Sequence, residues 1–358
     1  MKDNSFYLPI LKWKTGEKGA LKKLSVELKQ IVIPLVEFVK KEKIVKAEDN
    51  KTVYIPIPDS DVFRDDLQSI RESFSDMTLF VDTKLLTDVD RENAVVNICQ
   101  KVTLFDNKLY PVVYLSELEN VFSQETKDLL NKKGYCLRVS GNELKRLDSL
   151  MLEVSKKQKI HLVFDFGVTD KTIETFVPFI RKCKYIKHWK SITLASGAAP
   201  KYLTEFDSGA IGKLKRLDWL AWNKIVDNLN GFVSVNYGDF VTRFPIFENI
   251  HNPNTSFSFR YTGDENWFIF RGFSKKSKHY KGYIQYRAHA VNLVDNKKYQ
   301  FSGESFSNGD TYVKSKAKLV DDITGNPLNK KCGNATTWLQ AGINHHICKV
   351  VDQLINEL

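Results

Sequence analysis

Eight apolar segments of strand length recur between the start of the chain and about residue 240. Most are near-continuous hydrophobic runs, the pattern of strands that are buried on both faces of a parallel sheet. Longer stretches with a helical spacing of apolar residues lie between them. The eight segments are YLPILKW (7–13), VIPLVEFV (32–39), TLFVDTK (78–84), YPVVYLS (110–116), YCLRVSG (135–141), IHLVFDFG (160–167), SITLASG (191–197) and FVSVNYGDF (232–240).

Eight strands alternating with helices over this length match the count and size of a (β/α)₈ barrel. The stretches KGALKKLSVELKQ, NELKRLDSLMLEVSKKQ and KTIETFVPFIRKCKYI are expected to form helices of this barrel. An open doubly wound sheet is the alternative, but no GxGxxG follows the first strand, so a dinucleotide-binding fold has no support. We therefore predict an α/β chain in which residues 1–240 form a TIM-like (β/α)₈ barrel.

Residues 241–358 show a different pattern, with glycines, aromatics and short alternating runs. The segment TGDEN separates two strand-like runs and predicts a β-hairpin. A closing helix is expected from about Ala335 to Leu358, with Thr336 or Asn334 as its N-cap. This part of the chain is therefore predicted to be an α+β module that ends in a long helix.

Composition restricts the environment and the partners of the chain. The net charge of +11 permits contact with nucleic acid or another polyanion, although no zinc-finger, RNP or basic-helix signature accompanies it. The longest apolar runs fall well short of the roughly 18 residues that span a bilayer, and the start MKDNSFYLP does not resemble a signal peptide. Five cysteines without a CxxC pair favour reduced thiols. We expect a cytoplasmic protein with no membrane segment.

Polar residues at the ends of the predicted strands are the candidates for a site, because active sites of such barrels form at the C-terminal ends of the strands. An isolated charge in an apolar run, such as Asp165 in IHLVFDFG, is costly to bury unless it is paired, metal-bound or at the mouth. The set is either a ring of structural ion pairs or a site for an anionic ligand, and its clustering favours function. Its members are Lys12, Lys14, Glu37, Asp82, Lys84, Arg138, Asp165, Tyr237 and Asp239.

Two further features near the predicted mouth have alternative interpretations. Ser196 and Gly197 open the segment SGAAPKYL, where backbone N–H groups before a helix would hold a phosphate, but a tight turn explains the same residues. Magnesium is a candidate cofactor because carboxylates are its preferred protein ligands. No spacing specifies the metal, since each carboxylate lies on a different strand. The carboxylates concerned are Glu37, Asp82, Asp165 and Asp239.

The last predicted helix carries adjacent histidines in GNATTWLQAGINHHICKVVDQL. At about 100° per residue, His346 lies at the edge of the apolar stripe, and His345 points to nearly the opposite side with Trp338. His345 is therefore either a surface or interface residue or, over the barrel mouth, a general acid or base. Arg260 and Arg271 lie beside aromatics, which suits phosphate or stacked-base recognition and equally cation–π packing.

Several motifs, in their order and spacing, resemble the protein-beta family of phages and bacteria. The motifs are YLPILKWKTGEKGALKKL, IPLVEF, NYGDF, FRYTGDENWFIFRGF, FSNGD and GNATTWLQAGINHH, which together cover nearly the whole chain. The family is encoded in phages and in bacterial mobile or defence regions, and it brings no assigned chemistry. The resemblance singles out Lys12, Lys14, Gly16, Glu17, Glu37, Asp239, Arg260, Arg271, Gly272, Ser307, Gly309, Asp310, Gly333, Asn334, Trp338, His345 and His346. These residues fall at the predicted mouth and in the module, which implies that the module packs over the mouth as a lid.

We therefore expect an enzyme that acts on an anionic, phosphate- or nucleotide-containing substrate in phage–host conflict, with hydrolase or phosphodiesterase-like activity as a candidate chemistry. Lys12 would bind or polarise an anionic oxygen, and Asp165 or Asp239 would act as a base or as a metal ligand. His345 would act as acid or base from the lid. The substrate-binding set would be Lys14, Glu37, Asp82, Arg138, Ser196, Gly197, Tyr237, Arg260, Arg271 and Trp338. The alternative is a recognition or scaffolding subunit that binds a partner protein or nucleic acid.

Overall fold

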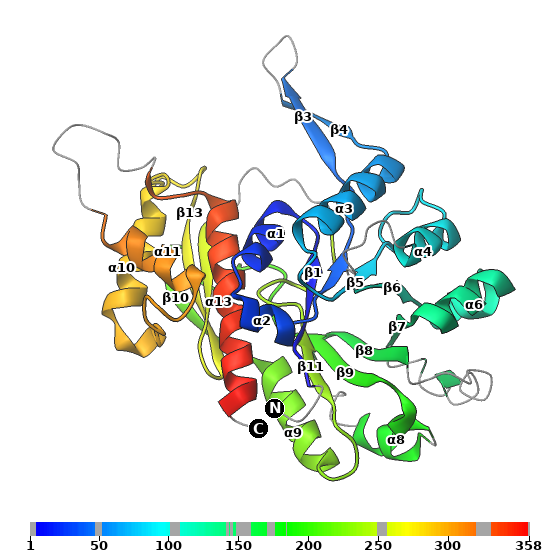
Figure 1. Ribbon diagram of the computed structural model, residues 1–358. Coiled ribbons are helices and arrows are strands. Elements are labelled where there is room, and N and C mark those ends of the chain that lie inside the picture. Colours follow the sequence, from blue (N-terminus) through cyan, green and yellow to red (C-terminus); the bar gives the residue numbers. More distant parts are fainter. Residues whose placement is uncertain are drawn as a thin grey trace.

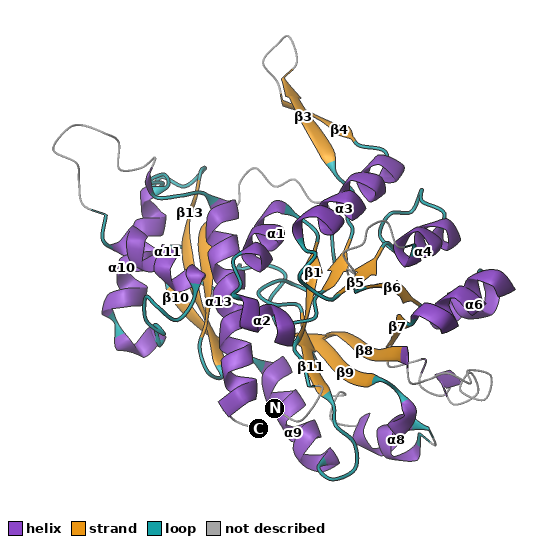
Figure 2. Ribbon diagram, in the orientation of Figure 1, coloured by secondary structure: helices purple, strands orange, loops and turns teal. Residues whose placement is uncertain are grey.

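A closed barrel of eight parallel strands forms the centre of the computed structural model (Figures 1 and 2). Around the barrel the strands follow the order β1, β11, β9, β8, β7, β6, β5, β2. Each of the eight predicted segments overlaps one of them, which confirms the predicted barrel. Their bounds are β1 Leu8–Lys12, β2 Leu35–Glu37, β5 Leu79–Asp82, β6 Leu109–Val113, β7 Tyr135–Ser140, β8 Ile160–Val168, β9 Ser191–Gly197 and β11 Asn236–Asp239. The structure describes residues 5–46, 52–100, 108–140, 143, 146–147, 159–169, 176–183, 185–248, 256–319 and 331–356.

Helices cover the outer face of the barrel (Figure 2). The stretch predicted as its first helix forms two, because the Ser25 side chain accepts a hydrogen bond from Leu28 N and starts a new helix there. The segment NELKRLDSLMLEVSKKQ lies mostly outside the described residues. The helices of the barrel are α1 Thr15–Lys22, α2 Val26–Ile31, α3 Asp59–Ser73, α4 Arg91–Cys99, α5 Leu115–Asn120, α6 Gln124–Lys133, α8 Val177–Lys182, the 3₁₀ helix η4 Ile186–His188 and α9 Leu217–Leu229.

The C-terminal module is built on a three-stranded antiparallel sheet in the order β10, β13, β12. The segment TGDEN joins β12 to β13, so the predicted hairpin is confirmed. Strand β10 comes from the connection between β9 and α9, and it ties the module to the barrel part of the chain. The elements are β10 Ile211–Lys215, β12 Ser256–Thr262, β13 Asn266–Ser274, α10 Ile284–Asp295, η5 Lys297–Tyr299 and α11 Asn308–Ala317.

The closing helix, α13 (Ala335–Asn356), is confirmed, and the Asn334 side chain caps it by accepting a hydrogen bond from Thr337 N at 3.1 Å. It lies alongside α1 on the outside of the barrel (Figure 1). Its residues Ile343 and Ile347 join the apolar core between the barrel and its helices. In this position α13 serves as the last helix of the barrel. The strands β12 and β13 and the helices α10 and α11 are thus inserted between β11 and α13.

Apolar side chains fill the barrel below its mouth and make it a packed core. They include Leu8, Ile10, Leu35, Phe80, Val112, Cys136, Val163 and Ala195. His161 shares this interior, between the rings of Phe80 and Tyr110. Its Nδ1 lies 2.7 Å from Ser191 Oγ. Burial, and then the charge of Lys190, lower the pKa of His161 from 6.5 to about 3. The imidazole is therefore neutral in the folded protein at pH 7.

Replacing His161 with phenylalanine is expected to remove an acid sensitivity. The unfolded chain binds a proton at His161 below pH 6.5, whereas the folded protein does not until the pH nears 3, so stability is lost as the pH falls. The wild type is expected to lose about 2 kcal/mol relative to His161→Phe between pH 7 and pH 5. Urea denaturation of both proteins at the two pH values measures this difference, and parallel curves would contradict the buried neutral histidine.

A two-stranded hairpin projects from the body of the protein after β2 (Figure 1). Its strands are β3 (Glu42–Lys46) and β4 (Thr52–Pro56), which pair antiparallel and were not predicted. Large apolar side chains on both strands face solvent, with exposed fractions of 42 to 69%. They are Ile44, Val45, Val53, Tyr54 and Ile55.

No helix in the described part of the chain is both long and apolar enough to cross a membrane.

Candidate active site at the barrel mouth

Six consecutive strands of the barrel each place one polar side chain at the same level of the mouth. In each strand the residue two positions earlier belongs to the apolar interior, so alternation aims all six side chains inward. Register sets Lys12 beside Glu37, and Glu37 beside Asp82. We call this set the mouth network; it consists of Lys12, Glu37, Asp82, Tyr114, Arg138 and Asp165. The prediction that charges from separate strands converge at the mouth is confirmed for its five charged members.

Arg138 is the centre of the mouth network. Its Nη1 donates to Glu37 Oε1 and to Asp82 Oδ2, both at 2.9 Å. Its Nε and Nη2 both donate to Asp165 Oδ2, at 2.9 and 2.6 Å. Burial acts to lower the pKa of Arg138, but the neighbouring carboxylates, Asp165 first, outweigh it and raise the pKa well above its ordinary value. The guanidinium is therefore a fixed positive charge at the centre of the mouth.

Each oxygen of the three carboxylates in the mouth network accepts at least one hydrogen bond. Lys12 donates to the second oxygen of Glu37. The hydroxyl of Tyr114 donates to Asp82 Oδ2 at 2.6 Å, and the backbone N–H of Lys84 donates to Asp82 Oδ1 at 2.9 Å. Asp165 Oδ1 accepts from Gly167 N at 2.8 Å. These bonds fix the positions of the carboxylates before any ligand binds.

Tyr114 was missed by the sequence analysis, although the available pattern identifies it. It stands two residues after Val112, an interior residue, as the other members of the mouth network stand two residues after theirs. Burial, and then Asp82, raise the pKa of Tyr114 well above its ordinary value, so its hydroxyl keeps the proton that it donates. No residue of the fourth predicted strand was among the candidates.

The charges of the mouth network do not cancel, because three carboxylates face two cations. The side chain of Asp165 is 17% exposed, and the other four charged side chains are at most 10% exposed. A second group of charges extends the mouth network toward solvent. Arg91 holds both oxygens of Glu117 at 2.8 and 3.0 Å, and Lys84 lies 3.4 Å from the same carboxylate. Asp165 is thus the most exposed carboxylate of the mouth network, and Lys84 is the half-exposed cation of the second group.

Tyr237 and Asp239 do not face the mouth, which corrects their predicted placement. Phe240, the residue after β11, belongs to the barrel interior, so the alternating residues Tyr237 and Asp239 point outward, under the helices. Asp239 accepts hydrogen bonds from the Tyr7 hydroxyl at 2.5 Å and from His346 Nε2 at 2.7 Å. Burial would raise the pKa of Asp239, but His346 and Tyr7 outweigh it and lower the pKa. Asp239 therefore joins the barrel to α13.

His345 is also away from the mouth, and it is buried inside the module. Its Nδ1 lies 2.8 Å from Asp310 Oδ2, and its Nε2 lies 2.8 Å from the carbonyl oxygen of Thr262. The ring stacks on Tyr261, with 3.9 Å between the ring centres. Trp338 is buried in the same module and donates from Nε1 to a backbone carbonyl. The predicted position of these two side chains over the mouth is therefore wrong, because α13 packs beside the barrel.

The two arginines predicted to recognise phosphate or bases donate to backbone carbonyls. Arg260 donates to Thr242 O and, at 3.3 Å, to Pro200 O, in the loops that follow β11 and β9. Arg271 donates to Phe206 O and, at 2.5 Å, to Leu203 O. These bonds attach the module to the edge of the barrel mouth. Both side chains thus have structural partners in the described residues.

The segment after β9 does not form the predicted phosphate cradle. No helix starts among residues 198–210, and the chain runs instead into β10. Ser196 alternates with the interior residue Ala195 and so points outward. Gly197 occupies the level of the mouth network, where an added Cβ would lie 2.8 Å from Pro245. Close approach of the following loop explains this glycine.

A magnesium site, considered above only as a candidate, does not fit the arrangement of the four carboxylates. Asp239 lies on the outer face of β11, and the other three carboxylates are bound by Arg138. Within the described ranges, no group of three His, Cys, Asp or Glu side chains is placed to hold a metal ion.

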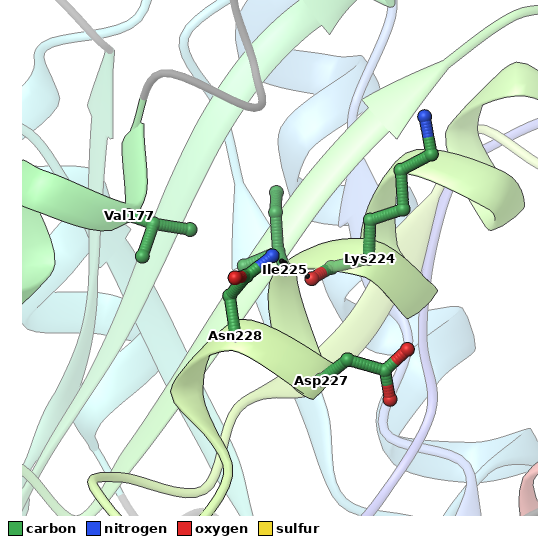
Figure 3. Close-up of a pocket in the computed structure, with 5 residues that line it drawn as sticks. All are labelled: Val177, Lys224, Ile225, Asp227 and Asn228. Carbon is green, nitrogen blue, oxygen red and sulfur yellow. Dashed lines mark hydrogen bonds between the residues drawn. The ribbon is translucent and has the colours of Figure 1, made fainter.

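A pocket of about 240 Å³ lies apart from the barrel mouth, between α8 and α9. Figure 3 shows its lining residues, Val177, Lys224, Ile225, Asp227 and Asn228.

Comparison with known families identifies the chain. The family model described as Beta protein matches residues 7–352. The chain belongs to the Beta protein family. The match runs from the residue before β1 into α13, so this family includes both the barrel and the inserted module. No curated protein matches the sequence.

Proposed function

We propose that this Beta protein is an enzyme that acts on an anionic, phosphate- or nucleotide-containing substrate at the barrel mouth. The observation that carries the proposal is the mouth network, in which three carboxylates are held by Arg138, Lys12 and Tyr114. In barrels of this architecture, catalytic residues come from the C-terminal ends of several strands. The mouth network occupies that position, directly above an apolar interior.

The energetics of the mouth network support a chemical role. Burying an ion pair seldom stabilises a fold more than apolar residues of the same volume would. Four charged groups are nevertheless buried together beside the partly exposed Asp165, in a barrel whose interior is otherwise packed with apolar side chains. Fixed, hydrogen-bonded charges in a water-poor site are what electrostatic stabilisation of a transition state requires.

Asp165 is the group that we assign as general base. It is the most exposed charged member of the mouth network, and Arg138 and Gly167 N fix the position of its carboxylate. A water molecule or hydroxyl at the mouth can reach it. The cations Lys12 and Arg138, with Lys84 on the solvent side, would balance charge that develops on a phosphoryl group. This arrangement suits hydrolysis of a phosphate ester.

The cellular setting is part of the same proposal. All five cysteines are buried thiols, which suits a reducing cytoplasm. A role in phages or in bacterial defence against them is proposed from the resemblance of the sequence motifs alone. The proposed enzyme would then act on a nucleotide or nucleic-acid component during infection.

Asp165→Asn tests the assignment, because the amide keeps the shape and an acceptor oxygen while removing the base. With bis(p-nitrophenyl) phosphate as probe, the variant is expected to lose about 100-fold or more in kcat. A thermal-shift screen with nucleotides, sugar phosphates and short nucleic acids identifies the ligand class, because binding to the folded state raises Tm. Ligand-induced shifts are expected to survive in Asp165→Asn. Equal turnover by wild type and variant would remove Asp165 from the mechanism.

A recognition or scaffolding subunit is the second candidate, and the β3–β4 hairpin is the observation that favours it. A projecting ribbon with apolar side chains on both strands is typical of a surface that binds a partner protein. In the same screen, absence of turnover together with a Tm shift from nucleic acid alone, unaffected by Asp165→Asn, would favour this candidate over the enzyme.

A further inference from the structure

A pocket of about 350 Å³ lies between the start of α1 and the base of the β3–β4 hairpin, outside the mouth network. Its volume falls in the range of small-molecule sites, roughly 300–1,000 Å³. Four lysines line it, from the segment after β1 and the segment after β2. They are Lys14, Lys18, Lys40 and Lys41. Glu42 is the one carboxylate among the lining residues, so the wall of the cavity carries an excess of positive charge.

Carboxylates behind the pocket hold three of these lysines in place. Lys18 and Lys41 both donate to Asp66 Oδ1, at 2.7 and 2.6 Å, so one buried carboxylate serves two ammonium groups. Lys40 donates to Thr87 and lies 3.6 Å from Asp59 Oδ2. The ammonium groups are therefore positioned in advance, and their positive charge is only partly neutralised.

Lys14 differs from the other three because it has no ion pair with any described carboxylate. Its Nζ lies 4.7 Å from the centre of the Phe247 ring. Burial, and then the charge of Arg243, lower the pKa of Lys14. An anion in the pocket would act in the opposite direction and stabilise the charged form. Glu17 and Glu42 raise the pKa of Lys14 without outweighing the causes that lower it, and neither forms an ion pair with it, so Lys14 can still make a direct ion pair with a bound anion.

Two more features of the pocket wall indicate what kind of anion fits. Helix α1 begins at Thr15, which lines the pocket, and no side chain caps its first turn, so the helix dipole adds positive potential at this wall. The opposite wall is apolar and aromatic, with Tyr54, Ile44 and Ile57. A ligand that satisfies both walls has phosphate at one end and a planar apolar group at the other.

We propose that this pocket binds a nucleotide, with its phosphates on Lys14 and the start of α1 and its base against Tyr54. The site is separate from the mouth network and does not depend on the reaction proposed there. It adds a second ligand to the protein, held where the hairpin joins the barrel (Figure 1).

Isothermal titration of the full chain with the four ribonucleoside diphosphates tests the site. At least one is expected to bind, pyrophosphate more weakly, and adenosine not measurably. Lys14→Gln is expected to weaken diphosphate binding about 10- to 100-fold, the range for a hydrogen bond to a charged group. Tyr54→Ser is expected to weaken nucleoside diphosphate but not pyrophosphate binding. Lys23→Gln is the matched control, since it removes the same charge from the exposed end of α1 and is expected to change nothing.

Three results would overturn the proposal. They are no binding of any of the four diphosphates, binding that Lys14→Gln leaves unchanged, and binding that is lost in Asp165→Asn instead. The last would place the nucleotide at the mouth and so support the enzyme proposal while removing the second site. Conversely, a loss confined to Lys14→Gln, with no phosphate-ester turnover in any protein, would keep this site and remove the enzyme.

Discussion

Arg138→Leu is expected to lower the free energy of unfolding by about 3–5 kcal/mol, the cost of leaving buried charges without their partner. The substitution removes the hydrogen-bond donors that Glu37, Asp82 and Asp165 share. Lys12 then remains as the one cation of the mouth network beside three carboxylates. Denaturant unfolding at pH 7 measures the difference from wild type.

Acid should partly rescue this variant, because protonation neutralises carboxylates that have lost their counter-charge. The deficit of Arg138→Leu is therefore expected to shrink between pH 7 and pH 4. Arg64→Leu is the matched control, since Arg64 pairs with Asp61 and Asp65 at an exposed position. Its cost should be small by comparison, because solvent screens an exposed ion pair. An equal, pH-independent loss in both variants would mean that Arg138 acts only through packing.

The barrel could be predicted because a strand buried on both faces has to be apolar nearly throughout. All eight barrel strands pack against helices on one face and against the interior on the other. Each strand therefore appears in the sequence as a nearly continuous apolar run. The three strands without this signature, β3, β4 and β10, were missed. β3 and β4 form a ribbon largely exposed to solvent, and β10 lies at the edge of its sheet with exposed and half-exposed residues. Nothing in such segments forces an apolar run.

The residues at the mouth were predicted correctly where they follow the alternation of inward and outward side chains along a strand. Three predicted side chains come two residues after an interior residue of the same strand and therefore point inward, where they converge. They are Lys12, Glu37 and Asp82. Asp239 directly precedes the interior residue Phe240, so its side chain points to the opposite, outer face of the barrel wall. The register was available in the sequence, because Phe240 is the apolar residue that points inward. Proximity to a strand end was the wrong criterion.

The role of the adjacent histidines could not be derived from helical periodicity. The period gives the angle between His345 and His346 but not what surrounds α13. The structure places α13 between the barrel, β12 and α11, so both faces of the helix are buried. His346 reaches Asp239 of the barrel from one side and the Thr262 hydroxyl of β12, at 2.8 Å, from the other. It therefore connects the barrel, the closing helix and the module.

His346→Leu is expected to cost about 3–5 kcal/mol, because it leaves the carboxylate of Asp239 buried without its main partner. In the wild type, burial lowers the pKa of His346, so the ring is neutral and donates from Nε2 to Asp239. Asp239→Leu alone should have a comparable effect. The double substitution should cost less than the sum of the two by about 1.5–3 kcal/mol, since the two residues share one interaction.

The pH dependence separates this contact from simple packing. The pKa of Asp239 is lowered in the folded protein, so its contribution is present above the ordinary carboxyl range and is lost as the pH falls. The lowered pKa of His346 acts in the same direction below pH 6.5. The gap between wild type and His346→Leu is therefore expected to narrow from pH 7 to pH 4 in chemical denaturation. A gap that stays constant, with additive single substitutions, would show that His346 and Asp239 stabilise the protein independently, and the barrel and module would then be joined mainly by the apolar contacts of α13.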